Sequence, residues 1–292
     1  MNTSTDISTR SIKTRRIKFR YPAGSLDRHY VQGDLVMSHV VAMLSAVFPE
    51  GEEYFIRSVR HFSDEIADPV LKKQVAGFIG QEVTHGREHR ELNARLQEMG
   101  YPTAYVDRVT IRALGHFTRF LPPYWNLAVT AALEHYTATL AETLLTDPRA
   151  QELLGTSEVR SMLLWHALEE SEHRAVAFDV YQTAGGTERT RVWSMRLISA
   201  GFVFGTIFHT VMSLSRDRAA YNPLRLLRSI AALRNSPFLT RSVIRRLFTY
   251  NRPGFHPDDV DNAELIAHWN TRLFGEHGQL AGNLGISTKP SV

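Results

Sequence analysis

Apolar residues recur three and four positions apart along most of the chain, and no segment alternates apolar and polar residues as a half-buried strand would. This pattern predicts an all-α protein. Proline and glycine mark where helices begin and end, because proline suits a first helical turn and glycine suits the residue after the last turn. We expect four long helices over residues 33–66, 69–100, 123–146 and 157–183. The first should bend at Pro49, and the segment 101–122 should hold a short helix.

The charged residues divide the chain into three parts. Residues 1–20 carry six basic side chains and one acidic one, which predicts a basic, flexible tail. Residues 21–186 contain the four long helices and an excess of acidic side chains, so we expect a metal-binding bundle there. The third part covers residues 187–292. Its first section, residues 187–252, contains twelve arginines and two acidic residues. We expect additional helices in this part that pack on the bundle or face a membrane.

The sequence contains no cysteine. Disulfides, iron–sulfur clusters, thiolate zinc sites and cysteine nucleophiles are therefore excluded. Histidine and carboxylate side chains would have to hold any metal ion. The first residues also lack an apolar run long enough for a secretory signal, which predicts a cytoplasmic location.

Histidine and glutamate residues gather on one face of each of two expected helices. Side chains three, four or seven positions apart on a helix lie close to one another on its surface. The helix over 69–100 has three such residues, and the helix over 157–183 has three within the segment WHALEESEH. They are Glu82, His85 and His89, and His166, Glu170 and His173. Each helix therefore presents a Glu-x-x-His pair and one further histidine.

Such pairs are typical of sites that hold two metal ions. Neighbouring cations repel one another, and bridging carboxylates neutralise that charge while imidazoles complete each coordination shell. Ferritin-like four-helix bundles supply one glutamate from each of two helices and a Glu-x-x-His pair from each of the others. Glu134 lies among apolar residues, where an unpaired carboxylate is costly, and the first helix offers Glu50, Glu52 or Glu53. We predict a ferritin-like bundle with two metal ions and additional C-terminal helices.

Three histidines have a second interpretation. His89 and His166 could bind metal directly, or they could be buried imidazoles that orient other ligands. His135 follows Glu134 by one position and therefore points about 100° away from it on the helix. Packing or an indirect role is favoured for His135.

Five segments together resemble the bacterial family described as predicted metal-dependent hydrolases: FPEGEEYF, GQEVTHGREHRELN, ALEHYTATLAE, WHALEESEHRAVAFDVY and RPGFHPDD. The resemblance extends over residues 20–260 and implies a ferritin-like metal protein, with Glu52 as the ligand from the first helix. The ligands that it implies are Glu52, Glu82, His85, Glu134, Glu170 and His173, with His89 and His166 as further ligands or as residues that support them.

The residues leave the type of reaction open. Mixed Glu/His centres in helical bundles often carry out oxygen chemistry, and this analogy favours an oxidase or oxygenase with two iron ions and a small or lipid-like apolar substrate. The family description favours a hydrolase, in which zinc or manganese would activate water. A non-catalytic metal-binding protein is the third alternative. We expect an oxidoreductase in preference to a hydrolase, with iron preferred over manganese or zinc.

Residues 197–214 form an uncharged, mostly apolar stretch at the lower limit of length for a membrane span. Downstream, arginines recur among apolar residues at helical spacing, as in a basic amphipathic helix. We expect Arg241, Arg245 and Arg246 to bind an anionic membrane surface, which would make the protein peripheral on the inner membrane. The alternative is that this region forms a buried helix that completes the bundle, with its arginines on the solvent-exposed face. Nucleic acid is not expected as a partner because no recognition motif accompanies the arginines, and a homodimer is compatible with the sequence.

Overall fold

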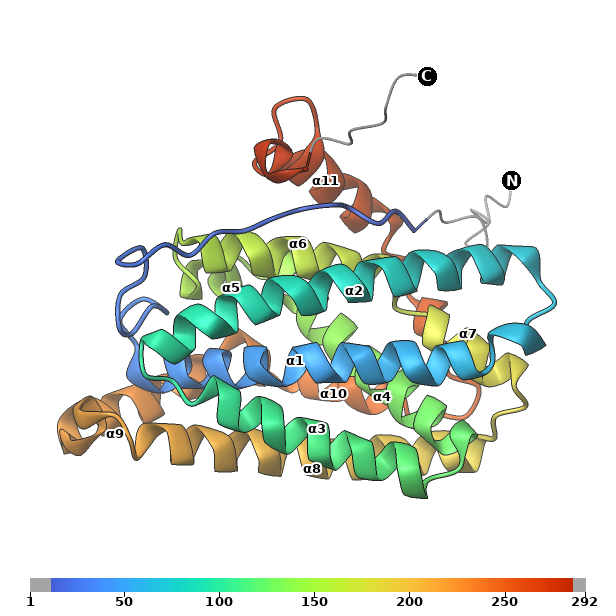
Figure 1. Cartoon of the computed structure of the whole chain (residues 1–292), viewed down its shortest axis with the longest axis horizontal. Coiled ribbons are helices and arrows are strands. Elements are labelled where there is room, and N and C mark those ends of the chain that lie inside the picture. Colours follow the sequence, from blue (N-terminus) through green and yellow to red (C-terminus); the bar gives the residue numbers. More distant parts are fainter. Residues whose placement is uncertain (1–11, 286–292) are drawn as a thin grey trace.

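The computed structural model describes residues 12–285, where every regular element is a helix and one isolated bridge joins Ile17 to Leu284. The all-α prediction is confirmed; the ferritin-like arrangement stays a prediction. The centre of the molecule is formed by four helices (Figure 1). They are α1 (Leu35–His61), α2 (Pro69–Glu98), α4 (Pro123–Thr146) and α6 (Glu158–His173).

Shorter helices and one further long helix surround this centre. They are α3 (Thr103–Phe120), α5 (Pro148–Leu153), α7 (Val176–Thr183), α8 (Glu188–Leu214), α9 (Pro223–Ala232), α10 (Arg241–Thr249) and α11 (Ala263–Phe274). Short 3-10 turns lie at Ser63–Glu65, Arg218–Tyr221, Leu233–Asn235, Pro237–Leu239, Pro257–Asp259 and Ala281–Asn283. In the C-terminal part, α8 packs against α1 and α4, α10 against α4, and α11 against α6.

The helix boundaries follow local chemistry. Asp34, Asp68 and Ser157 accept hydrogen bonds from the first free backbone N–H groups of α1, α2 and α6, and each therefore fixes where its helix begins. α1 continues through Pro49. The single helix expected over 157–183 is divided into α6 and α7 directly after His173.

The break between α6 and α7 places Arg174 in a buried ion-pair network. Its Nη1 lies 2.6 Å from Oε1 of Glu142 on α4, and its Nε lies 2.9 Å from Oδ1 of Asp258. Both partners are distant in sequence, so helical periodicity could not indicate this interruption.

The core consists of two apolar clusters with a polar layer between them. On α1, Met43 belongs to one cluster and Phe55 to the other; on α2, Leu92 and Phe78 are divided in the same way. The histidines and glutamates of α2 lie between its two apolar segments. Apolar packing at both ends of the bundle therefore fixes the helices that carry the polar layer.

The basic tail expected over residues 1–20 packs on the bundle from Ile12 onward, and the residues before Ile12 lie outside the described part of the chain. Ile17 is fully buried. A Cβ atom on Gly80 of α2 would lie 2.1 Å from Oγ1 of Thr14, so the tail can approach this helix because glycine has no side chain.

Candidate metal centre

The middle turns of the four central helices bring together seven side chains that can bind metal. α1 contributes one of them, α2 two, α4 one and α6 three. They are Glu52, Glu82, His85, Glu134, His166, Glu170 and His173, none of which is more than 4% exposed. All six residues that we predicted as principal ligands are therefore neighbours in one buried layer.

The structure selects one glutamate of the first helix. Glu52 points inward and is buried. Glu50 instead pairs with Arg57 at 2.7 Å, and the side chain of Glu53 is 43% exposed, with an oxygen 3.7 Å from Arg90. Glu52 is thus the residue of this trio that shares the layer with the histidines.

Two groups of three residues have the geometry to hold one ion each. Set 1 and set 2 each contain three donor atoms that lie within 4.8 Å of one another. Set 1 is Glu52, His85 and His166, and set 2 is Glu82, Glu170 and His173. Glu82 and His85 share α2 but belong to different sets, whereas Glu170 and His173 of α6 both belong to set 2. Glu134 adjoins set 2, with Oε2 3.4 Å from Nε2 of His173.

The donor atoms of these residues lack other partners. Buried polar atoms in proteins are almost always hydrogen-bonded, and a buried unpaired carboxylate oxygen is costly. Nine nitrogen or oxygen atoms in this layer are buried without a hydrogen bond: both carboxylate oxygens of Glu52, Glu82 and Glu134, Oε2 of Glu170, Nδ1 of His85 and Nε2 of His173. Oxygen and imidazole nitrogen ligands are those that suit divalent manganese, iron and zinc, so the residues fit a metal site.

Crowded carboxylates give the layer unusual electrostatics. Burial, together with the neighbouring carboxylates, raises the pKa of Glu52 well above its usual value. Burial likewise raises the pKa of Glu82 and of Glu134 to about 8. Without a cation, these three side chains therefore favour the protonated form near neutral pH.

Glu170 behaves in the opposite way. Burial alone would raise its pKa, but the neighbouring imidazoles of His166 and His173 outweigh burial and hold the pKa of Glu170 well below its usual value. Nε2 of His166 lies 2.9 Å from Oε1 of Glu170. Glu170 is therefore an anion that belongs to set 2 and also contacts His166 of set 1.

Two imidazoles are oriented by residues outside the sets. Nε2 of His85 lies 3.0 Å from Glu169, whose other oxygen is 2.8 Å from Arg15. Because Glu169 is ionised beside this arginine, His85 donates through Nε2 and leaves Nδ1 facing set 1. Nδ1 of His173 donates to Oε1 of Gln81 at 2.8 Å, so Nε2 is the nitrogen that faces set 2. Glu134 and Glu170 raise the pKa of His173 well above its usual value, and a metal ion would take the place of the proton on Nε2.

A chain of hydrogen bonds fixes the third imidazole. Ser45 donates to Oδ1 of Asn93 at 2.7 Å, so the 2.9 Å bond between Ser45 and Nδ1 of His89 is donated by the histidine. Nε2 of His89 must then accept from Nδ1 of His166, 2.9 Å away. Nε2 of His166 is therefore the nitrogen that faces set 1 and Glu170. In the structure His166 lies in the layer, and His89 contacts it from outside.

Sequence periodicity did not identify the orienting residues Glu169, Gln81 and Arg15. Glu169 neighbours Glu170 and lies off the shared face of its helix, which is the position from which it reaches His85. Arg15 belongs to the N-terminal segment, whose path over the bundle no periodic signal predicts. The local signal in the sequence was a second glutamate directly before the predicted ligand Glu170.

A third histidine–carboxylate group lies elsewhere in the described part of the chain. His29 and His39 each place Nε2 3.1 Å from Oδ2 of Asp217. The guanidinium of Arg28 lies 2.9 Å from the same oxygen and supplies the positive charge that a metal ion would bring. We therefore assign this group to ion pairing between the N-terminal segment, α1 and the residues after α8.

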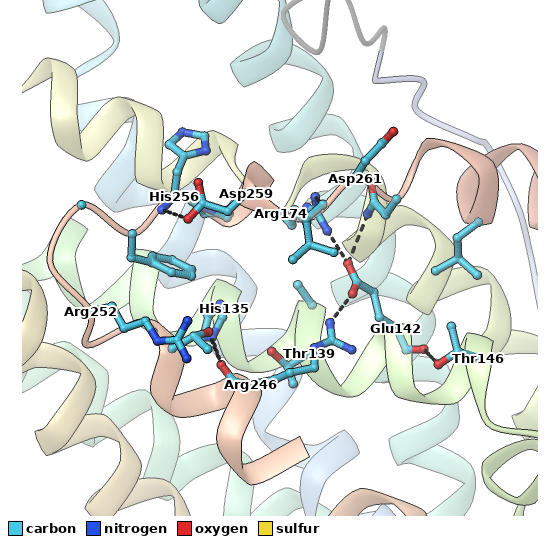
Figure 2. A pocket seen from close by; sticks show the side chains of 18 of the residues that line it. His135, Thr139, Glu142, Thr146, Arg174, Arg246, Arg252, His256, Asp259 and Asp261 are labelled. Atoms are coloured by element: carbon cyan, nitrogen blue, oxygen red, sulfur yellow. Dashed lines mark hydrogen bonds and ion pairs between the residues drawn. The ribbon is translucent and has the colours of Figure 1, made fainter. Parts of the chain in front are cut away.

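A surface pocket of about 810 Å³ lies between α4, α10 and the segment over 252–265, and it contains none of the seven side chains of the metal centre (Figure 2). Glu142 binds Arg174 and Arg246 at its wall. Arg246, one of the three arginines that we expected at a membrane surface, is thus paired with this glutamate. His135 lines the pocket and donates from Nε2 to the carbonyl of Arg246 at 3.1 Å, consistent with an indirect role.

Gly86→Ala should weaken metal binding without destabilising the protein. A Cβ atom at this position would lie 3.0 Å from Oε2 of Glu52 and would displace that carboxylate. Alanine in a helix interior is otherwise about 0.5–1 kcal/mol more favourable than glycine. Metal titration and thermal unfolding of the metal-free variant measure the two effects separately. Unchanged metal affinity would contradict the position assigned to Glu52.

The metal-free protein should become less stable as pH rises from 6.5 to 8. The folded chain keeps protons on Glu82 and Glu134, with pKa values of about 8, whereas the unfolded chain loses them near 4.5. His166, whose pKa is lowered, opposes this trend only below about 6.5, where it titrates in the unfolded chain. Melting temperatures in chelator should fall over this range, and Glu134→Gln should reduce the slope. A flat or rising profile in the unmodified chain would disprove this account.

The chain matches the family model described as predicted metal-dependent hydrolase over residues 13–261. No curated protein and no solved structure matches it significantly. The family description overturns our preference for an oxidoreductase over a hydrolase, which depended on an analogy between helical bundles and not on a residue of this site. The match covers most of the chain, and the protein therefore belongs to the family of predicted metal-dependent hydrolases.

Proposed function

We propose that this protein is a hydrolase whose buried layer binds two divalent metal ions, one in set 1 and one in set 2, and that its substrate is a small or lipid-like molecule. The observation that supports the proposal is the group of nine buried donor atoms without hydrogen bonds, distributed over two adjacent sets. Apolar packing holds these atoms in place, and protons or cations are what can satisfy them. The family description supports hydrolysis as the reaction class.

The two sets differ in their numbers of carboxylates and imidazoles. Set 1 offers two imidazoles and one carboxylate, and set 2 offers two carboxylates and one imidazole. His85 and His166 stack with ring centroids 4.1 Å apart, a separation at which two imidazolium cations would repel each other. Metal ions bound there would supply a Lewis acid that polarises the bond to be cleaved and would activate water at neutral pH.

Aromatic rings exclude bulk water from the layer. Phe78 lies edge-on to His173 with ring centroids 5.0 Å apart, and Trp165 lies edge-on to His85 at the same distance. Electrostatic interactions are stronger in such surroundings because the local dielectric is low. The same rings restrict the motion of both imidazoles.

The proposal can be tested with a matched pair of variants on α1. The chelated protein would be reloaded with zinc, manganese or iron, and hydrolysis of ester, amide and phosphoester substrates would be measured together with metal content. Glu52→Gln should lower metal affinity at least about tenfold and abolish hydrolysis. Glu53→Gln makes the same chemical change one position away, on an exposed side chain, and should alter neither.

Hydrolysis that persists after chelation, or equal losses in both variants, would refute the metal centre as the catalytic site. Metal binding without hydrolysis of any substrate in the panel would leave a metal-binding protein and would refute the hydrolase. Two bound ions per chain are expected. A stoichiometry of one would disprove the division into two sets.

A further inference from the structure

Helix α8 distributes its side chains in the opposite way from an ordinary surface helix, with polar ones inside and apolar ones outside. Small hydroxyl side chains face the bundle, where α8 contacts α1 and α4; these are Thr190, Ser194, Thr210 and Ser213. Large apolar side chains point outward at helical spacing and form one stripe, in which Phe204 is 71% exposed. The stripe consists of Trp193, Leu197, Phe204, Ile207, Phe208 and Val211.

Neighbouring helices extend this surface. The rings of Tyr105 on α3 and His209 on α8 meet with centroids 6.3 Å apart. α9 follows α8 in the chain, and all three helices pack on α1. We call the outer surface of α3, α8 and α9 the apolar face. Exposed apolar side chains also occur on α3, at Ile111, Phe117 and Phe120, and on α9, at Leu224, Leu227 and Ile230.

Exposed arginines accompany the apolar face. They are Arg108, Arg112, Arg119, Arg189, Arg196, Arg216, Arg218, Arg225 and Arg228. The two acidic groups over 187–252 are already paired, since Asp217 is buried against Arg28 and Glu188 pairs with Arg191 at 2.6 Å. Every basic residue over 187–252 is arginine, whose planar guanidinium binds phosphate oxygens in pairs. On α10, Arg241 and Arg245 are exposed as well.

We propose that the apolar face docks on the surface of an anionic lipid bilayer, with the stripe among the acyl chains and the arginines on the lipid phosphates. An apolar stripe edged by cations matches a layer of acyl chains edged by phosphates. A second copy of the chain is a poorer match, because a symmetric contact would bring the same arginines to face one another.

Contacts on the inner side of α8 determine whether this helix would cross the bilayer or lie parallel to its surface. α8 is long and apolar enough to cross a bilayer, and only 11% of its most apolar 18-residue stretch is buried in the protein. Arg191 on its inner side is fully buried and donates from Nη2 to the carbonyl of Arg252 at 2.8 Å. Crossing would break this contact and the packing on α1 and α4, so α8 lies in the plane of the membrane surface with its stripe outward.

Co-sedimentation of the full chain with phosphatidylglycerol vesicles and with phosphatidylcholine vesicles tests the proposal. The protein should bind the anionic vesicles preferentially, and binding should weaken as salt rises. Arg196→Glu with Arg228→Glu should reduce it about thirty-fold. Lys72→Glu with Lys73→Glu changes the charge equally on α2, away from the apolar face, and should have little effect. Phe204→Asp should weaken binding without unfolding the chain, because the side chain is exposed.

Three results would overturn the proposal. One is the absence of binding to either vesicle, and another is equal loss in the arginine and lysine double variants. The third is a dimer in lipid-free solution that Phe204→Asp converts to monomer, which would assign the apolar face to a second copy of the chain. None of these measurements depends on hydrolysis, so the membrane surface and the hydrolase can fail independently.

Discussion

The burial of four glutamates in the middle of a helical bundle is the constraint on which the rest of the structure depends. Each of Glu52, Glu82, Glu134 and Glu170 is at most 2% exposed, and they converge from four helices. Water cannot stabilise these carboxylates, and like charges at this distance oppose one another. The helices stay together because an apolar cluster packs them on either side of the polar layer. A polar layer of this kind is stable with protons or cations in it, which explains why three of the four pKa values are raised.

The orientation of the imidazoles depends on a different part of the chain. Glu169 fixes the ring of His85, and Arg15 fixes Glu169. Gln81 fixes His173, and its amide nitrogen is held by the carbonyl of Lys13 at 3.1 Å. The N-terminal segment therefore reaches two of the three rings through one intermediate residue each. Gly77 and Gly80 permit its close approach to α2, so two glycines remote from the metal centre contribute to its geometry.

Sequence periodicity predicts the part of this centre that lies within single helices. The inward faces of α2 and α6 follow from spacing alone, because a regular helix fixes which residues share a side. The combination of Glu52 with His85, and of Glu82 with His173, depends on the rotation and offset of one helix against another, which no local pattern encodes. The break after His173 depends on distant partners of Arg174 for the same reason. The reaction class was wrong because it was taken from the fold, and a fold supports many reactions.

The metal centre and the apolar face depart from ordinary burial in opposite directions. Carboxylates lie where water is absent, and the large apolar side chains of α8 lie where a soluble protein would place polar ones. The two proposals give each feature a partner that the chain itself does not supply, a cation in the first case and an apolar surface in the second. α1 connects them, because it carries Glu52 toward the polar layer and packs against α3, α8 and α9. α1 therefore links the polar layer to the helices that carry the apolar face, and a metal ion held by Glu52 and a lipid surface docked on α8 would both act on this one helix.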